Sequence, residues 1–251
     1  MTSERPYGVA ILGLGHWYSA YGLARALPEY PHASLKDVIN PDSFERLCAE
    51  LPGLELFNQE FGRRRAHGQK SHDRYALQYH PRLDPLLSPT WREFIGELHG
   101  PAYHDFWRRT YGLKRSERFV LSMHWHHAPS GASVSPHTDA RRKIGSHIFY
   151  FNTEQDWNPS WGGQTLVLDD GGMLPAHASP HVDALRRVAA SDILGNRSFI
   201  FKRTDHSWHA VEPIACPPDR LRKVFIVVAN RVNLQVLWRR VRGKYPDGYR
   251  L

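Results

Sequence analysis

Two side chains that bind metals stand close together in the segment His137-Thr138-Asp139. In an extended chain alternate side chains point the same way, so this imidazole and this carboxylate can reach one ion. A distant histidine would complete a face of two histidines and one carboxylate, which is typical of non-haem Fe(II) oxygenases. By itself the pair is weak, because the chain holds 16 histidines and most of them must be surface or hydrogen-bonded structural residues.

Further motifs accompany this pair in a fixed order. They are Pro136 before the pair, Ile148-Phe149-Tyr150-Phe151-Asn152, Trp161-Gly162-Gly163-Gln164, and Ser207-Trp208-His209-Ala210-Val211-Glu212-Pro213. Together they resemble the 2-oxoglutarate/Fe(II) dioxygenase superfamily, in its prolyl 4-hydroxylase-like branch, over about residues 118–230. The resemblance implies a double-stranded β-helix (jelly-roll) core, with Fe(II), 2-oxoglutarate and O₂. It also implies that His137, Asp139 and His209 are the catalytic metal ligands.

His206 competes with His209 for the role of third ligand. It lies three residues earlier and lacks the Val-x-Pro that follows His209. A strand would point these two side chains to opposite faces, so only one should face the metal. We favour His209.

A basic residue about ten positions after the distal histidine binds the far carboxylate of 2-oxoglutarate in the family that this chain resembles. Arg220 lies 11 positions after His209, and Arg222 lies 13 positions after it. A guanidinium suits a buried carboxylate because its fork makes two parallel charge-assisted hydrogen bonds. We favour Arg220 over Arg222, which leaves the other of the two as a surface residue.

The chain departs from the family upstream of the metal pair. Many members have a tyrosine there, about nine residues before the pair, that contacts the co-substrate. This chain has His124-Trp125-His126-His127 instead, and either His126 or His127 could donate that hydrogen bond. The alternative is that these histidines only alternate between the interior and solvent.

The resemblance implies hydroxylation of an unactivated C–H bond, with release of succinate and CO₂. We expect a small, polar or anionic substrate. Arg141-Arg142-Lys143 directly follows the metal pair and could attract an anion, although a solvated charged run is the simpler interpretation. The alternatives are a hydroxylase of protein or peptide side chains, a zinc hydrolase, and a non-catalytic binding module on the same fold.

The elements that must position these residues fall into an α+β, mainly β pattern. Helices are expected at 42–51, from about 88 to 98, and at 102–111, and a short one at 182–190. Short runs rich in aromatic and β-branched residues, at 118–126, 147–152, 164–168, 198–202 and 223–229, predict strands. We expect a single domain, with a helical supporting region at 1–115, the catalytic core at 116–232 and a basic tail at 233–251.

Composition excludes several other classes of protein. Hydrophobic residues make up 41% of the 251 residues, which is typical of a globular chain, and no apolar run is long enough to span a bilayer. The net charge of +8 is spread over scattered doublets, so nucleic acid is a poor candidate partner. Two distant cysteines predict a reduced, cytoplasmic protein. Gly13-Leu14-Gly15 starts like a dinucleotide-binding turn, but Tyr18 stands where that motif needs its third glycine.

Overall fold

Two antiparallel β-sheets form most of the structure, a computed structural model that describes residues 32–63, 69–232, 234 and 238. The α-helices of this part are α2 (Pro41–Ala49), α3 (Pro89–Leu98) and α4 (Pro101–Tyr111), with short 3-10 helices at Leu54–Leu56, Pro81–Leu86, Pro159–Trp161 and Val182–Ala184. The strands are β1 (His32–Lys36), β2 (Asn58–Glu60), β3 (Arg74–Gln78), β4 (Phe119–Ala128), β5 (Val134–His137), β6 (Lys143–Tyr150), β7 (Thr165–Asp169), β8 (Arg186–Ala190), β9 (Arg197–Lys202), β10 (Trp208–Val211) and β11 (Arg222–Arg231).

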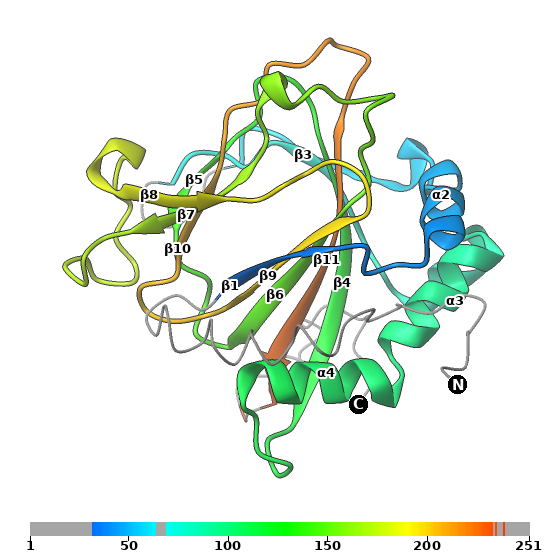
Figure 1. Cartoon of the computed structure of the whole chain (residues 1–251), viewed down its shortest axis with the longest axis horizontal. Helices are drawn as coiled ribbons and strands as arrows, with labels where there is room; N and C mark the ends of the chain where they lie inside the picture. Colours follow the sequence, from blue (N-terminus) through cyan, green and yellow to red (C-terminus); the bar gives the residue numbers. More distant parts are fainter. Residues whose placement is uncertain (1–31, 64–68, 233, 235–237, 239–251) are drawn as a thin grey trace.

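The larger sheet has the strand order β1-β9-β6-β11-β4-β3-β2, and the smaller has the order β5-β10-β7-β8. In Figure 1 the helices α2, α3 and α4 lie along one side of the larger sheet, and the smaller sheet lies on the other side. The centre of the larger sheet is the ten-residue pairing of β4 with β11. Strand order and long-range pairing therefore bring residues from distant parts of the sequence onto one surface between the sheets.

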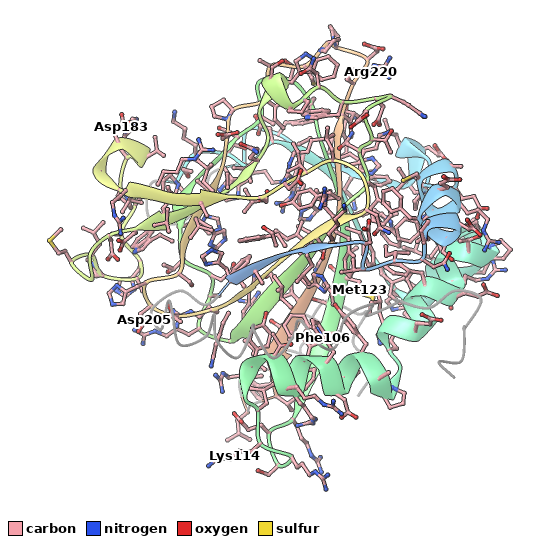
Figure 2. All side chains as sticks on the ribbon, in the orientation of Figure 1. Phe106, Lys114, Met123, Asp183, Asp205 and Arg220 are labelled. Atoms are coloured by element: carbon pink, nitrogen blue, oxygen red, sulfur yellow. The ribbon has the colours of Figure 1, made fainter. Side chains whose placement is uncertain are left out.

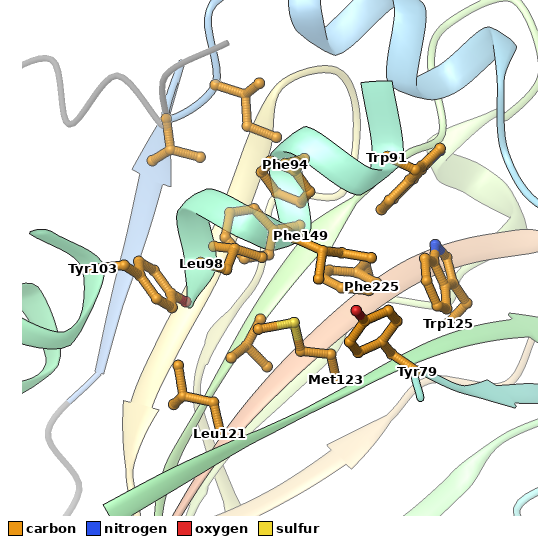
Figure 3. Close-up of a cluster of buried hydrophobic side chains, with 14 of the residues drawn as sticks. Tyr79, Trp91, Phe94, Leu98, Tyr103, Leu121, Met123, Trp125, Phe149 and Phe225 are labelled. Atoms are coloured by element: carbon orange, nitrogen blue, oxygen red, sulfur yellow. The ribbon is translucent and has the colours of Figure 1, made fainter. Parts of the chain in front are cut away.

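The outer face of the larger sheet packs against the helices through large apolar side chains. Figure 3 shows Trp91, Phe94 and Leu98 of α3 beside Trp125 of β4 and Phe225 of β11. Trp91, Trp125 and Phe225 are completely buried. Full burial of a large apolar side chain contributes about 1.5–3 kcal/mol, so this layer is a major source of stability.

Local sequence explains where the helices begin and end. The Ser88 side chain caps α3 by accepting a hydrogen bond from the Trp91 backbone N–H at 3.2 Å, and Pro89 begins the helix. Gly112 ends α4 in the left-handed conformation, at φ +62°. At α2 the Asn40 side chain caps the helix by accepting a hydrogen bond from the Asp42 backbone N–H at 3.1 Å.

The five predicted strands are all present within residues 119–231, with ends shifted by a few residues. The predicted helix at 182–190 is wrong: only Val182–Ala184 is helical, and Arg186–Ala190 is the edge strand β8. The amino-terminal region is also more than a set of helices, since β1, β2 and β3 extend the larger sheet. Gly13-Leu14-Gly15 and most of the tail at 233–251 lie outside the described residues.

Candidate metal centre and its cavity

Three predicted metal ligands converge between the two sheets. His137 is the last residue of β5 and pairs directly with His209 on β10, and Asp139 follows two residues beyond the strand. One ligand atom from each of the three side chains lies within 4.8 Å of the other two. The two imidazole rings have their centroids 4.2 Å apart. Sequence neighbours and strand pairing thus build one cluster of the composition that a ferrous ion accepts.

Both histidines are oriented by the backbone. The Nδ1 atoms of His137 and His209 lie 3.0 Å from the carbonyl oxygens of Ser135 and Ser207, respectively. A hydrogen bond from Nδ1–H to a carbonyl leaves Nε2 as the ligating atom, which is the usual arrangement around metals. Burial lowers the pKa of both imidazoles, and a neutral imidazole is the form that binds a metal.

The carboxylate of Asp139 is held by two neighbours. Lys143 Nζ lies 2.5 Å from Oδ1, and the Ser146 hydroxyl donates to Oδ2 at 3.3 Å. Burial acts to raise the pKa of Asp139, but the Lys143 ammonium and the nearby histidines outweigh it and hold that pKa below its usual range. The carboxylate is therefore ionised and ready to ligate.

His206 does not join the cluster. It lies in the turn before β10, with Nδ1 3.1 Å from Oδ2 of Asp170. His209 rather than His206 lies in the cluster, and the predicted alternation does not apply because only residues 208–211 form the strand.

A cavity surrounds the three ligands and lies between the inner faces of the two sheets. Its other lining residues are His72, Asp73, Arg74, His126, Ala128, Ala132, Ser133, Val134, Lys143, Ser146, Ile148, Thr165, Phe201, Val211, Ile214, Arg222, Ile226 and Val228. Polar and charged side chains thus make up much of the cavity wall, beside apolar side chains of β6 and β11 such as Ile148 and Ile226.

The two arginines considered for the co-substrate lie in different surroundings, and the preference for Arg220 needs correction. Arg222 is buried on β11 and lines the cavity. Arg220 precedes the strand, and its side chain is 41% exposed and pairs with Asp219 at the periphery (Figure 2). The spacing from His209 does not distinguish the two arginines, but β11 begins only at Arg222, so Arg220 lies outside the strand.

The buried Arg222 is positioned by main chain and hydroxyl groups. Its Nε donates to the Gly163 carbonyl at 2.5 Å, and an Nη atom lies 3.3 Å from the Thr165 hydroxyl. Gly163 has φ +82°, and a Cβ atom there would lie 3.0 Å from the Arg222 side chain. Tyr150 lies under the guanidinium, 5.5 Å from ring centroid to Cζ, and shares the Thr165 hydroxyl. In the sequence, Gly163 and Tyr150 were recognised only as parts of motifs, and their contacts with Arg222 were not predicted.

The adjacent residues His126 and His127 of β4 also lie in different surroundings. His126 lines the cavity, whereas His127 faces the helix side and stacks on Phe57 with ring centroids 4.5 Å apart. The expectation that His127 could serve the co-substrate is therefore wrong, because successive residues of a strand point to opposite faces. His126 keeps that possible role. Lys143 lines the cavity, whereas Arg141 and Arg142 are not among its described lining residues.

Comparison with known protein families gives a match over this part of the chain. Residues 123–228 match the model of the 2OG-Fe(II) oxygenase superfamily, a span that includes all three clustered residues and Arg222. No curated protein sequence matches the chain.

Solved structures share the fold. A Pseudomonas putida prolyl-4-hydroxylase aligns with a TM-score of 0.57 at 17% identity, covering 85% of this chain and 100% of that one. A Trichoplax adhaerens prolyl hydroxylase, solved in complex with a hypoxia inducible factor peptide fragment, aligns at 0.59 and 11% identity, covering 86% and 90%. An oxidoreductase of the 2OG-Fe(II) oxygenase family from Burkholderia pseudomallei gives 0.53 and 12%, covering 85% and 91%. Residues 123–228 therefore carry a 2OG-Fe(II) oxygenase domain, and oxygenases of this superfamily use Fe(II), 2-oxoglutarate and O₂.

Proposed function

We propose that this enzyme hydroxylates an unactivated C–H bond of a small polar or anionic substrate. One atom of O₂ enters the hydroxyl group of the product. The other oxygen atom enters succinate, which forms as 2-oxoglutarate loses CO₂. The observation that carries the proposal is the convergence of His137, Asp139 and His209 within one cavity that also holds Arg222.

The proposed roles follow from the contacts of each residue. His137, Asp139 and His209 hold Fe(II), which supplies the oxidising chemistry when it is bound. Arg222 holds the far carboxylate of 2-oxoglutarate, because it is a buried guanidinium without a carboxylate partner among the described residues. His126 lies on the same cavity wall and is proposed to hydrogen-bond the co-substrate where relatives use a tyrosine.

The supporting fold is proposed in the same terms. The two facing sheets would be the halves of a double-stranded β-helix, formed by the core at 116–232 within a single domain of 1–251. The flanking region at 1–115 supplies helices and further strands. A cytoplasmic location is proposed because Cys48 and Cys216 are both free. None of the helices in the described residues is long and apolar enough to cross a bilayer.

A peptide substrate is the second candidate. It is favoured by one observation, the structural likeness to a prolyl hydroxylase solved with a peptide fragment. The site itself carries the first candidate, because its polar groups lie inside a cavity between the sheets.

Aerobic release of succinate with Fe(II) and 2-oxoglutarate, across a panel of metabolites and peptides, tests the proposal. We expect substrate-dependent succinate from the wild type, none above background from His137→Ala, and strongly reduced release from Arg222→Ala. Arg220→Ala is the matched control, since it removes a guanidinium two residues away that lies outside the cavity. Hydrolysis that continues without O₂ would indicate a zinc hydrolase instead. Metal binding without succinate formation across the panel would indicate a binding module.

A further inference from the structure

The charged residues that line the cavity differ in the partners they would have when the metal and 2-oxoglutarate are bound. Arg74 already has a partner outside the lining, because its guanidinium lies 2.8 Å from the Glu60 carboxylate. Asp73 accepts a hydrogen bond from the Gly62 backbone at 2.8 Å. Arg222 would be neutralised by 2-oxoglutarate. The remaining charged pair is Lys143 with Asp139.

Lys143 depends on the metal-binding carboxylate for its counter-charge. It is the first residue of β6, its side chain is 22% exposed, and its Nζ lies 2.5 Å from Oδ1 of Asp139. The preceding Arg141 and Arg142 are absent from the described residues that line the cavity. Of the basic run, Lys143 thus holds its ammonium group beside the metal cluster.

Binding of a divalent metal changes the charge balance around Lys143. Two neutral histidines, one carboxylate and a divalent cation sum to one positive charge, and the dianionic co-substrate is balanced by that charge and Arg222. The Asp139 carboxylate then compensates the metal, and Lys143 has no second carboxylate within 4 Å among the described residues. A cation in such a place is stabilised by an anion, because attraction is stronger in a medium of low dielectric constant.

We propose that Lys143 binds an anionic group of the substrate, a carboxylate or a phosphate. The inference rests on the proposed function and adds the residue and the chemistry of recognition to it. Because Nζ lies 2.5 Å from a ligand oxygen, an anion on Lys143 must sit near the metal. The C–H bond that is oxidised therefore lies only a few bonds from the anionic group of the substrate.

Binding of simple anions to the loaded enzyme tests this inference without turnover. The protein is loaded with Mn(II) and 2-oxoglutarate in the absence of O₂. The paramagnetic relaxation of ³¹P in inorganic phosphate, and of the ¹³C-carboxyl group in labelled propionate, is then titrated. We expect saturable relaxation with at least one probe, and the probe that responds shows which anion the site prefers. Lys143→Met should weaken that binding about tenfold or more, and Lys143→Arg should retain it.

A matched control is Lys223→Met, because Lys223 also pairs with an aspartate at 2.5 Å but lies outside the cavity lining. It should bind the probes as the wild type does. Lys143→Gln keeps a donor for Asp139, so it separates loss of the anion site from damage to the metal site. It should bind Mn(II) and lose the anion.

Three outcomes would overturn the inference. Equal anion affinity in Lys143→Met and wild type would place the anion elsewhere, for example on the metal itself. Absence of saturable relaxation with both probes, while Mn(II) and 2-oxoglutarate bind, would overturn it and leave the proposed function standing. Failure of the wild type to bind Mn(II) or 2-oxoglutarate would overturn the proposed function, and this inference with it.

Discussion

The two faces of the larger sheet are built from alternate residues of the same strands, and they do different work. On β4, Trp125 points into the helix-covered core, while the next residue, His126, lines the cavity. On β11, Phe225 is completely buried among aromatic side chains, while Ile226 lines the cavity. The comparison teaches that one face supplies stability through packing and the other holds the polar groups in place.

The largest expected effect belongs to the inner side. His137→Ala or Asp139→Ala should reduce metal binding and succinate release to background, because two protein ligands cannot hold the ion as three do. Equilibrium dialysis with Fe(II) under anaerobic conditions measures the binding. His206→Ala is the control, and it should still bind one metal ion per chain. An equal loss of metal binding in His206→Ala would indicate that His206 also ligates the metal, which would contradict the assigned ligand set.

A large effect on stability is expected on the outer face. Phe225→Ala should lower the free energy of unfolding by about 3–5 kcal/mol, because it leaves a cavity in a packed aromatic cluster. Ile226→Ala on the same strand should cost clearly less, since that side chain is only partly buried. Urea denaturation of both variants measures the difference. Equal costs would contradict the division between the two faces.

A smaller effect is expected on the binding of the co-substrate. Arg222→Ala should raise the KM for 2-oxoglutarate about 10- to 100-fold, in line with the loss of hydrogen bonds to a charged group. Arg220→Ala should leave that KM unchanged. Steady-state kinetics with varied 2-oxoglutarate measures both, and the reverse pattern would restore the prediction made from spacing.

The smallest effect concerns acid stability on the outer face. Burial lowers the pKa of His127 to about 3, with Lys223 adding to the shift, and its Nε2 has no hydrogen-bond partner in the described part of the chain. Its folded pKa lies below its unfolded value of about 6.5, so the stability held above pH 6.5 is lost as the pH falls.

His127→Leu should therefore change stability little at pH 7.5 and stabilise the protein by about 2 kcal/mol relative to wild type at pH 5. Chemical denaturation at both pH values measures this. The same difference between variant and wild type at the two pH values would show that His127 is not buried in its neutral form.

Sequence reasoning found the parts of the site that depend on local spacing. The pair His137 and Asp139 could be recognised because the two residues are neighbours, and His209 could be recognised from the motif around it. The five central strands were also visible as aromatic and β-branched runs.

The parts that failed depend on where strands begin and which strands pair. Arg220 was preferred over Arg222 because spacing does not reveal that β11 starts at residue 222. The contribution of Arg74 to the cavity wall could not be predicted, since it requires β3 to pair with β4 across a long stretch of sequence. The edge strand β8 was taken for a helix because its Arg-Arg-Val-Ala-Ala sequence carries little strand signal, and pairing with β7 decides its structure.

The most direct test of the account is anomalous diffraction from crystals of the protein grown anaerobically with Mn(II) and 2-oxoglutarate. We predict one strong anomalous peak within bonding distance of His137 Nε2, His209 Nε2 and a carboxylate oxygen of Asp139. Co-substrate density should reach the Arg222 guanidinium. A peak elsewhere, or no peak at these three residues in crystals that contain the metal, would contradict the account.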